Sequence, residues 1–400
     1  MGLFLRGRVT SAAVLDRLAS RLGQEPQVSS LRVDSEAVEV VLHPAAESVD
    51  FVLEAGDGLR VMAKTSTVGP GYHAYLVDLL RGLGDELGVH WESVEDDTGY
   101  YAGGDFSTVE REMLVWIGAV ARLVLEKDAV GLMVSLPTTH RFAFDGALAT
   151  PLGPRSIDWV KAVAADPSVG RDLFPWWGRG VDAQQRLSRV LCRMWTEVRW
   201  REPITDEEDD LRQELLAELA EAYAADPTLD YPWREWASLG CAEPFVVEAA
   251  AQATGPLVGY RRRPVRVDLP GGWSLELPGA FAEEQEESGT YSAWDGSQTV
   301  WFSAFRNEGS AESLLRDGAG EVQSNSRVMS RAGIVDEKGD DGEVYRKMTV
   351  RAAPVAGGRL AVLTLCWPID GNGDGDSAWA EQIRGSVDYH GSLGTQSTSS

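Results

Sequence analysis

The chain has 400 residues, which is too long for one ordinary hydrophobic core and predicts two or three domains. Apolar residues make up 44% and charged residues 25%, a balance typical of a folded chain rather than a disordered one. The formal net charge of −25 repels nucleic-acid phosphates and anionic lipid, so we expect no nucleic-acid partner.

The pattern of apolar residues and the cysteines indicate in which cellular compartment the protein resides. The sequence has no apolar run long enough to cross a bilayer, so we expect no membrane insertion. The apolar run at the N-terminus is too short for a signal peptide. The three cysteines include no CxxC pair, so neither a zinc knuckle nor a redox motif is indicated. These features favour a bacterial-type protein of the cytoplasm.

Residues 1–150 predict a mixed α/β domain. Apolar residues at positions 14, 15, 18 and 22 indicate a helix, and short strand-like runs follow between residues 31 and 63. The turn 69–71 then precedes a helix with apolar residues at 72, 76, 79, 80, 83 and 87. Ser107 and Glu110 form a capping box, which places the start of another helix at Ser107.

Residues 151–250 predict a mainly helical extension of that domain. One helix carries apolar residues at 187, 190, 191, 194, 195 and 198. Thr205 and Glu208 form a second capping box at the start of another helix. At the other end of the chain, residues 391–400 are rich in Ser, Thr and Gly, which predicts a disordered tail.

Residues 258–390 read as strands, a helix, more strands and a last helix. The run Leu-Pro-Gly-Gly-Trp-Ser-Leu-Glu-Leu-Pro at 269–278 predicts a hairpin. This order of elements resembles the small α/β sandwich of the Mog1/PsbP-like families, and 269–278 is similar to their usual first hairpin. The resemblance implies an antiparallel sheet with packed helices and a binding or accessory role. The predicted fold class of the whole chain is therefore multidomain α+β.

The turn at 69–71 suggests a ligand-binding cleft. His73 stands in the first turn of the predicted helix, where it could act as an acid or base near neutral pH. If the loop after residue 95 packs against this turn, His73 and Asp97 could form a polar dyad beside Tyr72 and Tyr100. The alternative is a histidine on the surface, or one satisfied by a backbone carbonyl.

Tryptophans and basic residues offer further candidates. Trp176 and Trp177 lie in a probable loop, where they could bind a partner protein, although such residues more often belong to a core. The basic run at 261–263, with Arg266, indicates either a solvated linker or strand edge, or a local anion or partner contact. His140 follows a probable strand, a position where α/β proteins place functional groups.

Residues 370–381 match the calcium loop of the EF-hand. The ligands would be side chains of Asp370, Asn372 and Asp374, the backbone carbonyl of Asp376, and Glu381. The preceding segment reads as a strand rather than as an entering helix. The alternative is therefore a turn whose acidic residues cap the last helix, with no cofactor.

Common catalytic motifs are missing from the sequence. It contains no P-loop, no GxSxG elbow, no HExxH helix and no GxGxxG turn between a strand and a helix. We therefore expect a non-catalytic protein-interaction or accessory protein of a bacterial cytoplasmic system, with other proteins as partners. The alternatives are an enzyme or small-ligand binder with a cleft near His73 and Asp97, and a calcium-binding loop at 370–381.

Overall fold

The computed structural model describes residues 1–9, 13–55, 57–127, 131–286, 289–316, 320–339, 342–369 and 377–391. Helices and largely antiparallel sheets make this a multidomain α+β fold, as the sequence predicts. Contacts divide the chain into two compact units. The first unit contains Met1–Leu136, Phe144–Val198 and Asp210–Gly259, and the second contains Pro137–Ala143, Arg199–Asp209 and Tyr260–Ser400.

This division differs from the predicted domains at two short segments. Residues 137–143 fall within the predicted N-terminal domain, and residues 199–209 within the predicted helical extension. Both segments make their contacts in the second unit. The chain therefore passes between the two units several times, which sequence composition does not reveal.

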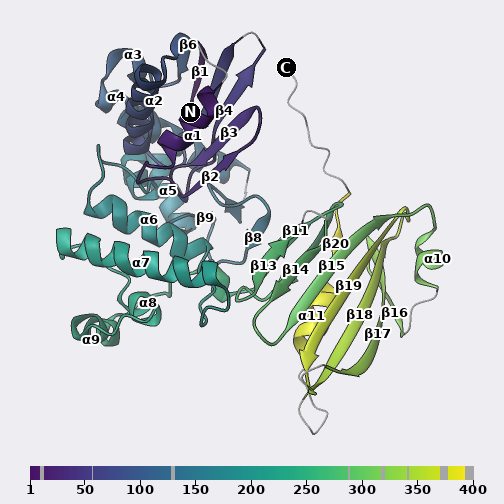
Figure 1. The fold of residues 1–400 in the computed structure, drawn as a ribbon. Helices are drawn as coiled ribbons and strands as arrows, with labels where there is room; N and C mark the ends of the chain where they lie inside the picture. Colours follow the sequence, from purple (N-terminus) through teal and green to yellow (C-terminus); the bar gives the residue numbers. More distant parts are fainter. Residues whose placement is uncertain are drawn as a thin grey trace. The chain divides into compact units, whose positions relative to one another are not determined.

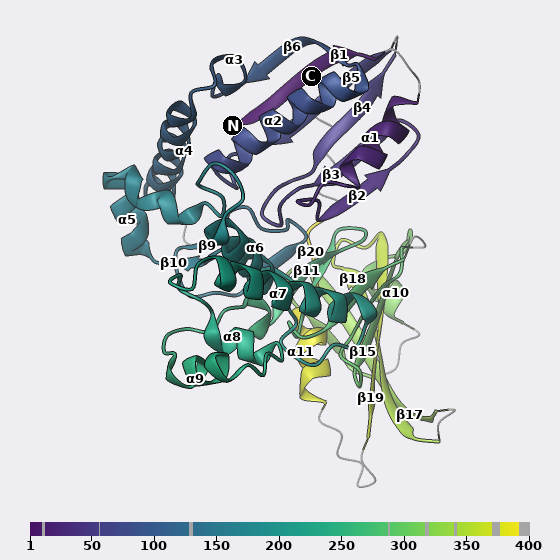
Figure 2. The same ribbon diagram turned by 60° about the vertical axis from the view of Figure 1, so that its left-hand side comes forward.

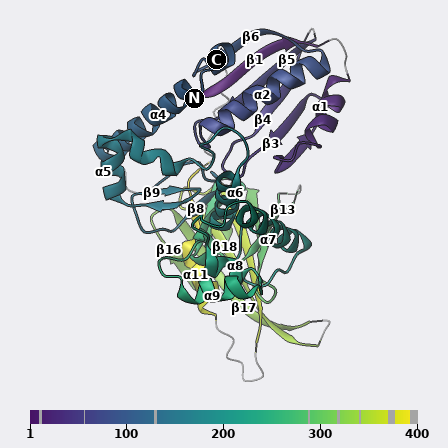
Figure 3. The ribbon, with the colours of Figure 1, turned by 90° about the vertical axis from the view of Figure 1, so that its left-hand side faces the viewer.

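An antiparallel sheet of six strands, in the order β2-β3-β4-β5-β1-β6, organises the first unit. Its strands are β1 (Gly2–Arg8), β2 (Ser30–Val33), β3 (Ala37–Val41), β4 (Val49–Glu54), β5 (Gly58–Lys64) and β6 (His90–Asp96). Helices α1 (Val14–Leu22) and α2 (Pro70–Leu87) lie along one face of this sheet (Figure 2, Figure 3). Alternate strand residues such as Val38 and Val40 are fully buried in the core that α1 and α2 share.

The rest of the first unit is mainly helical. It contains α3 (Tyr100–Gly103), α4 (Phe106–Glu126), α5 (Ile157–Ala165), η1 (Pro167–Leu173), α6 (Ala183–Thr196), most of α7 (Asp206–Ala225), α8 (Trp233–Ser238) and α9 (Pro244–Gln252). A small sheet is formed by β7 (Leu132–Met133), β9 (Leu148–Thr150) and β10 (Gly153–Arg155). Over the ranges that the structure describes, none of the helices combines the length and apolar character needed to span a bilayer.

The two predicted capping boxes have different outcomes. Thr205 caps α7 as predicted, because its Oγ1 accepts a hydrogen bond from the Glu208 N–H at 3.2 Å. Helix α4 begins one residue before the predicted start, and its cap is Asp105, whose Oδ1 accepts from the Ser107 N–H at 3.0 Å. Asp105, two residues before Ser107, offers the stronger, charged acceptor.

The second unit contains two antiparallel sheets. The larger has the order β13-β14-β15-β19-β18-β17-β16 (Figure 1). The smaller has the order β20-β12-β11-β8. The strands are β8 (His140–Phe142), β11 (Val265–Leu269), β12 (Trp273–Leu277), β13 (Ala282–Gln285), β14 (Tyr291–Trp294), β15 (Thr299–Arg306), β16 (Val322–Ser324), β17 (Val328–Lys338), β18 (Val344–Pro354), β19 (Arg359–Pro368) and β20 (Asp388–Tyr389).

Helices complete the second unit. They are η2 (Tyr260–Arg262), α10 (Ala311–Leu315) and α11 (Ala378–Ser386). The predicted hairpin is formed by β11 and β12, with Leu269 opposite Trp273. Segment 137–143 contributes β8, which pairs with β11. The similarity to Mog1/PsbP-like families stays a prediction, and residues 392–400 of the predicted tail lie outside the described residues.

The turn before α2 makes a close backbone contact with the Trp176 loop. The Gly71 N–H donates to the Trp176 carbonyl at 3.1 Å, and the Trp176 N–H donates to the Val68 carbonyl at 3.0 Å. A Cβ atom on Gly71 would overlap the Gly178 carbonyl oxygen and the Trp176 ring. Position 71 therefore requires glycine because the neighbouring loop leaves no room for a side chain, and not because of the backbone dihedral angles of Gly71.

Two glycines of α2 should respond oppositely to replacement by alanine. Gly71→Ala should lower the free energy of unfolding by about 1–3 kcal/mol, because the loop must move to admit the new methyl group. Gly82→Ala should raise it by about 0.5–1 kcal/mol, because nothing lies within 4 Å of its Cβ position and alanine favours helix. Urea unfolding measures both, and equal stabilities would refute the close approach.

Candidate functional site

His73 lies in a buried polar cluster of the first unit rather than in a cleft. Its side chain is fully buried, and its Nδ1 lies 2.9 Å from Thr65 Oγ1. Its Nε2 lies 3.0 Å from Thr98 Oγ1 and 3.2 Å from Asp96 Oδ1. Both ring nitrogens therefore have partners inside the core, and the carboxylate partner is Asp96 rather than the predicted Asp97.

Asp96 is held in its charged form. Burial would raise the pKa of its carboxyl, but hydrogen bonds from His73 and from the Tyr101 and Thr98 N–H groups hold that pKa well below its usual range. The carboxylate thus links the end of β6 to the start of α3 and to α2. This saturated network accounts for His73 structurally.

The other residues of the predicted cleft lie apart. Tyr72 and Tyr100 are 0% and 2% exposed and belong to the core. Asp97 is exposed, and its Oδ2 accepts a hydrogen bond from the Gly2 N–H at 3.0 Å. Asp97 lines a hollow of about 360 Å³ whose lining residues do not include His73. The predicted His73–Asp97 dyad is therefore wrong, because the strand end directs Asp96 inward and Asp97 outward.

The two adjacent tryptophans have different environments. Trp176 is 0% exposed, and its Nε1 donates to the Gly180 carbonyl at 2.8 Å. Its ring packs in the core near His43 and Tyr75. Trp176 therefore fits the alternative prediction of a core residue and offers no partner surface. Trp177, by contrast, is only half-buried, and its ring centroid is 5.6 Å from that of Phe174.

Trp177 lines a cavity of about 620 Å³ within the first unit, large enough for a small ligand or a few side chains. Its apolar lining residues are Leu152, Val169, Phe174, Pro175 and Trp177. Its polar lining residues come from the end of η1 and the start of α6, and they are Arg171, Asp172, Asp182, Gln184, Gln185 and Ser188. The lining thus combines apolar and aromatic residues with polar and charged ones.

Gln185, one of the lining residues, carries an unused acceptor. Its side chain is 3% exposed, and its Nε2 donates to Gln27 Oε1 at 3.3 Å. Its Oε1 is buried and has no hydrogen-bond partner among the residues that the structure describes. A buried amide oxygen without a partner costs free energy, which a ligand N–H or O–H group would recover once the Gln185 side chain turned toward the cavity.

The charged lining residues are held by contacts within the protein. The Arg171 guanidinium carbon lies 4.9 Å from the centre of the Trp177 ring, at cation–π distance. Asp172 Oδ1 accepts a hydrogen bond from Trp159 Nε1 at 3.1 Å. Asp182 Oδ1 accepts from the Gln185 N–H at 2.8 Å and so caps α6. These contacts fix the positions of the groups that a ligand would meet.

The calcium prediction falls mostly outside the described residues, because Asp370, Asn372, Asp374 and Asp376 are not among them. Glu381 is described: it lies exposed on α11, 3.5 Å from Arg384. In the parts of the chain that are described, no group of three or more His, Cys, Asp or Glu side chains could hold a metal ion.

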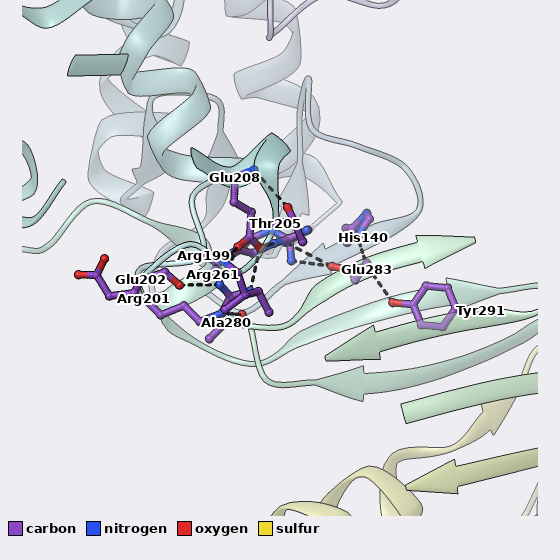
Figure 4. Close-up of polar contacts among 11 residues, drawn as sticks. His140, Arg199, Arg201, Glu202, Thr205, Glu208, Arg261, Ala280, Glu283 and Tyr291 are labelled. Atoms are coloured by element: carbon purple, nitrogen blue, oxygen red, sulfur yellow. Dashed lines mark hydrogen bonds and ion pairs between the residues drawn. The ribbon is translucent and has the colours of Figure 1, made fainter. Parts of the chain in front are cut away.

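A second polar cluster lies within the second unit and is centred on Glu283 (Figure 4). Its Oε1 accepts a hydrogen bond from Arg261 Nη1 at 2.7 Å and lies 3.3 Å from Arg199 Nη1. Its Oε2 accepts from the Tyr291 hydroxyl at 2.9 Å and lies 2.9 Å from His140 Nε2. Arg261 of the basic run is thus a buried ion-pair partner, 6% exposed, rather than part of a solvated linker.

The cluster joins three segments that are distant in sequence. Arg201 contacts Glu208 through two hydrogen bonds of 2.6 and 2.8 Å, and its Nε donates to the Ala280 carbonyl at 2.7 Å. Burial would raise the pKa of Glu283, but the His140 hydrogen bond and the Arg261 charge lower it. Because its ion pairs and hydrogen bonds join residues of all three segments, the cluster fixes segments 137–143 and 199–209 to the second unit.

Comparison of the sequence with protein-family models and with curated proteins returned no match. Among solved structures, a crystal structure from Bacteroides thetaiotaomicron VPI-5482 is similar, with 14% sequence identity and a TM-score of 0.27. The similarity covers 32% of this chain and 48% of that chain, so this chain spans about half the length of the protein it matches.

Proposed function

We propose that this chain is a non-catalytic protein that binds another polypeptide, and that the cavity beside Trp177 receives part of that partner. The observation that carries this proposal is the half-buried Trp177, which lines the same cavity as Gln185, a residue whose buried Oε1 has no partner among the described residues. Tryptophan is enriched at the energetically important positions of protein interfaces. A buried acceptor beside it supplies the specificity that an apolar surface alone lacks.

A small-molecule ligand in the same cavity is the second candidate. The volume of about 620 Å³ and the buried Gln185 acceptor favour it. We place the protein in the cytoplasm, where its three free cysteines would remain reduced. An accessory role for the second unit, as the Mog1/PsbP-like resemblance implies, is part of the same proposal.

Site-directed photo-crosslinking in the native host tests the proposal. A photo-reactive residue at Gln184, which is exposed and lines the cavity, should give a discrete protein adduct. The same residue at the exposed Glu221 of α7, which does not line the cavity, is the matched control and should not give that adduct. Trp177→Ala should reduce the adduct at Gln184 by about tenfold, the effect of truncating one aromatic anchor.

Two outcomes would contradict the polypeptide proposal. The first is the same adduct pattern at both positions. The second is native mass spectrometry of the purified full chain showing a bound compound of a few hundred daltons that Trp177→Ala removes. That second result would establish the small-molecule binder instead.

A further inference from the structure

We infer that the group received by the Trp177 cavity is a cationic N–H donor, the guanidinium or ammonium of an arginine or lysine side chain in the partner. This inference rests on the proposed function, because it names the chemistry that the same cavity selects. It follows from which hydrogen-bonding positions around the cavity are already used.

The polar lining residues carry both donors and acceptors, and Arg171 is the cationic donor among them. One N–H of the Gln185 amide is used by Gln27, whereas the Gln185 carbonyl oxygen has no partner among the described residues. The Gln184 amide N–H donates to the Ser188 hydroxyl at 3.2 Å. A ligand group that meets the Gln185 carbonyl or the Asp182 carboxylate must supply hydrogens, and a guanidinium carries five N–H donors and no acceptor.

Asp182 adds a negative charge at the same place. Its Oδ1 caps α6, so only Oδ2 can turn to a ligand. That Oδ2 lies 3.4 Å from the position of a Cβ on Gly178, which places it where the chain of Trp177 and Gly178 borders the cavity. Hydrogen bonds between charged partners are shorter and about twice as strong as neutral ones.

Arg171 is the one cation among the lining residues, and it lies over the Trp177 ring. The negative charges of Asp172 and Asp182 outweigh its positive charge, so the lining as a whole is negative. At longer range, the net charge of −25 attracts a basic partner and repels an acidic one. Removal of Arg171 should therefore strengthen binding of a cation, whereas it would weaken binding of an anion.

Selection from a phage-displayed library of random dodecamer peptides on the immobilised full chain tests this inference. Peptides whose binding requires Trp177 should share an arginine or lysine. In a synthetic copy of such a peptide, replacing that arginine with citrulline should weaken binding about tenfold, because the charge is lost while the shape is kept.

Two variants should give effects of opposite sign, and a third is the control. Asp182→Asn should weaken binding of the peptide about tenfold while keeping the helix cap, because asparagine caps as well as aspartate. Arg171→Gln should strengthen binding of the same peptide. The matched control is Asp105→Asn at the cap of α4, outside the cavity lining, which should change nothing.

The possible failures are distinct. Peptides that require Trp177 but share acidic or uncharged residues would overturn the cation inference and leave the polypeptide-binding proposal standing. Weaker binding by Arg171→Gln would do the same. Enrichment that is unaffected by Trp177→Ala, or no enrichment, would count against the proposed function itself.

Discussion

Acidification from pH 7 to pH 5 should lower the free energy of unfolding of the first unit by about 2 kcal/mol through one residue, His43. Its side chain is 0% exposed, and burial, with a smaller contribution from the Arg189 charge, lowers its pKa to about 3. The unfolded chain has the ordinary value near 6.5. Folding therefore excludes a proton that the unfolded chain binds once the pH falls below that value.

The direction of the pH effect follows from this difference. Above pH 6.5 both states are neutral at His43, and the contribution is fully present. Below that pH only the unfolded state gains the proton, so stability falls by about 1.4 kcal/mol for each pH unit until the folded pKa is reached. The local geometry favours the neutral ring. His43 Nδ1 accepts a hydrogen bond from the Ala45 N–H at 3.1 Å, and its Nε2 has no partner among the described residues.

His43→Asn isolates the effect. An asparagine oxygen can accept from the N–H two residues on, so the turn is kept while the titrating ring is lost. The variant should be less stable at pH 7.5, because the ring packs near Tyr72 and Trp176, but its stability should fall less between pH 6.5 and 5. Hydrogen exchange of peptides from β3 and α2 in urea reports the first unit separately.

The exposed His90 supplies the control for this measurement. His90→Asn should keep the full pH dependence of the natural chain. An unchanged slope in His43→Asn would show that His43 is protonated in the folded state.

Local patterns in the sequence predicted the elements but not the site. The apolar spacing from 72 to 87 predicts α2, and Thr205 predicts the start of α7, because both signals lie within a few turns of one helix. The pairing of β8 with β11 joins residues more than a hundred positions apart, and no local pattern specifies it. Sequence spacing alone also could not decide between Asp96 and Asp97 as the partner of His73.

The Trp177 cavity shows the same limit. The sequence alone indicates that Trp177 is an aromatic residue in a loop. It also shows that Asp182 comes directly before a helical pattern, where a capping residue is expected. Whether Gln185 offers a donor or an acceptor depends on Gln27, 158 residues away in the sequence. The Gln185 amide N–H donates to Gln27, and the Gln185 carbonyl oxygen is left as the acceptor. A free acceptor is defined only once the fold has paired its neighbours, so a reading of single residues misses it.

Glu283→Gln should lower the free energy of unfolding of the second unit by about 3 kcal/mol, the lower end of the cost of breaking a buried ion pair. The carboxylate is mostly buried and faces Arg261 and Arg199. A neutral amide leaves these guanidinium groups without the charge that offsets their removal from water. The neighbouring Glu284→Gln, exposed on the same strand, should change stability by less than about 0.5 kcal/mol.

A double-mutant cycle distinguishes this charge effect from a general loss of packing. Arg261→Met should destabilise the natural chain, because it leaves Glu283 with a weakened set of partners. In the Glu283→Gln background the same change should cost much less or restore stability, because it removes a buried cation that no longer has its carboxylate. Hydrogen exchange of peptides from β13 to β15 in urea gives the four stabilities. If the two substitutions add independently, the cluster stabilises the second unit through shape rather than charge.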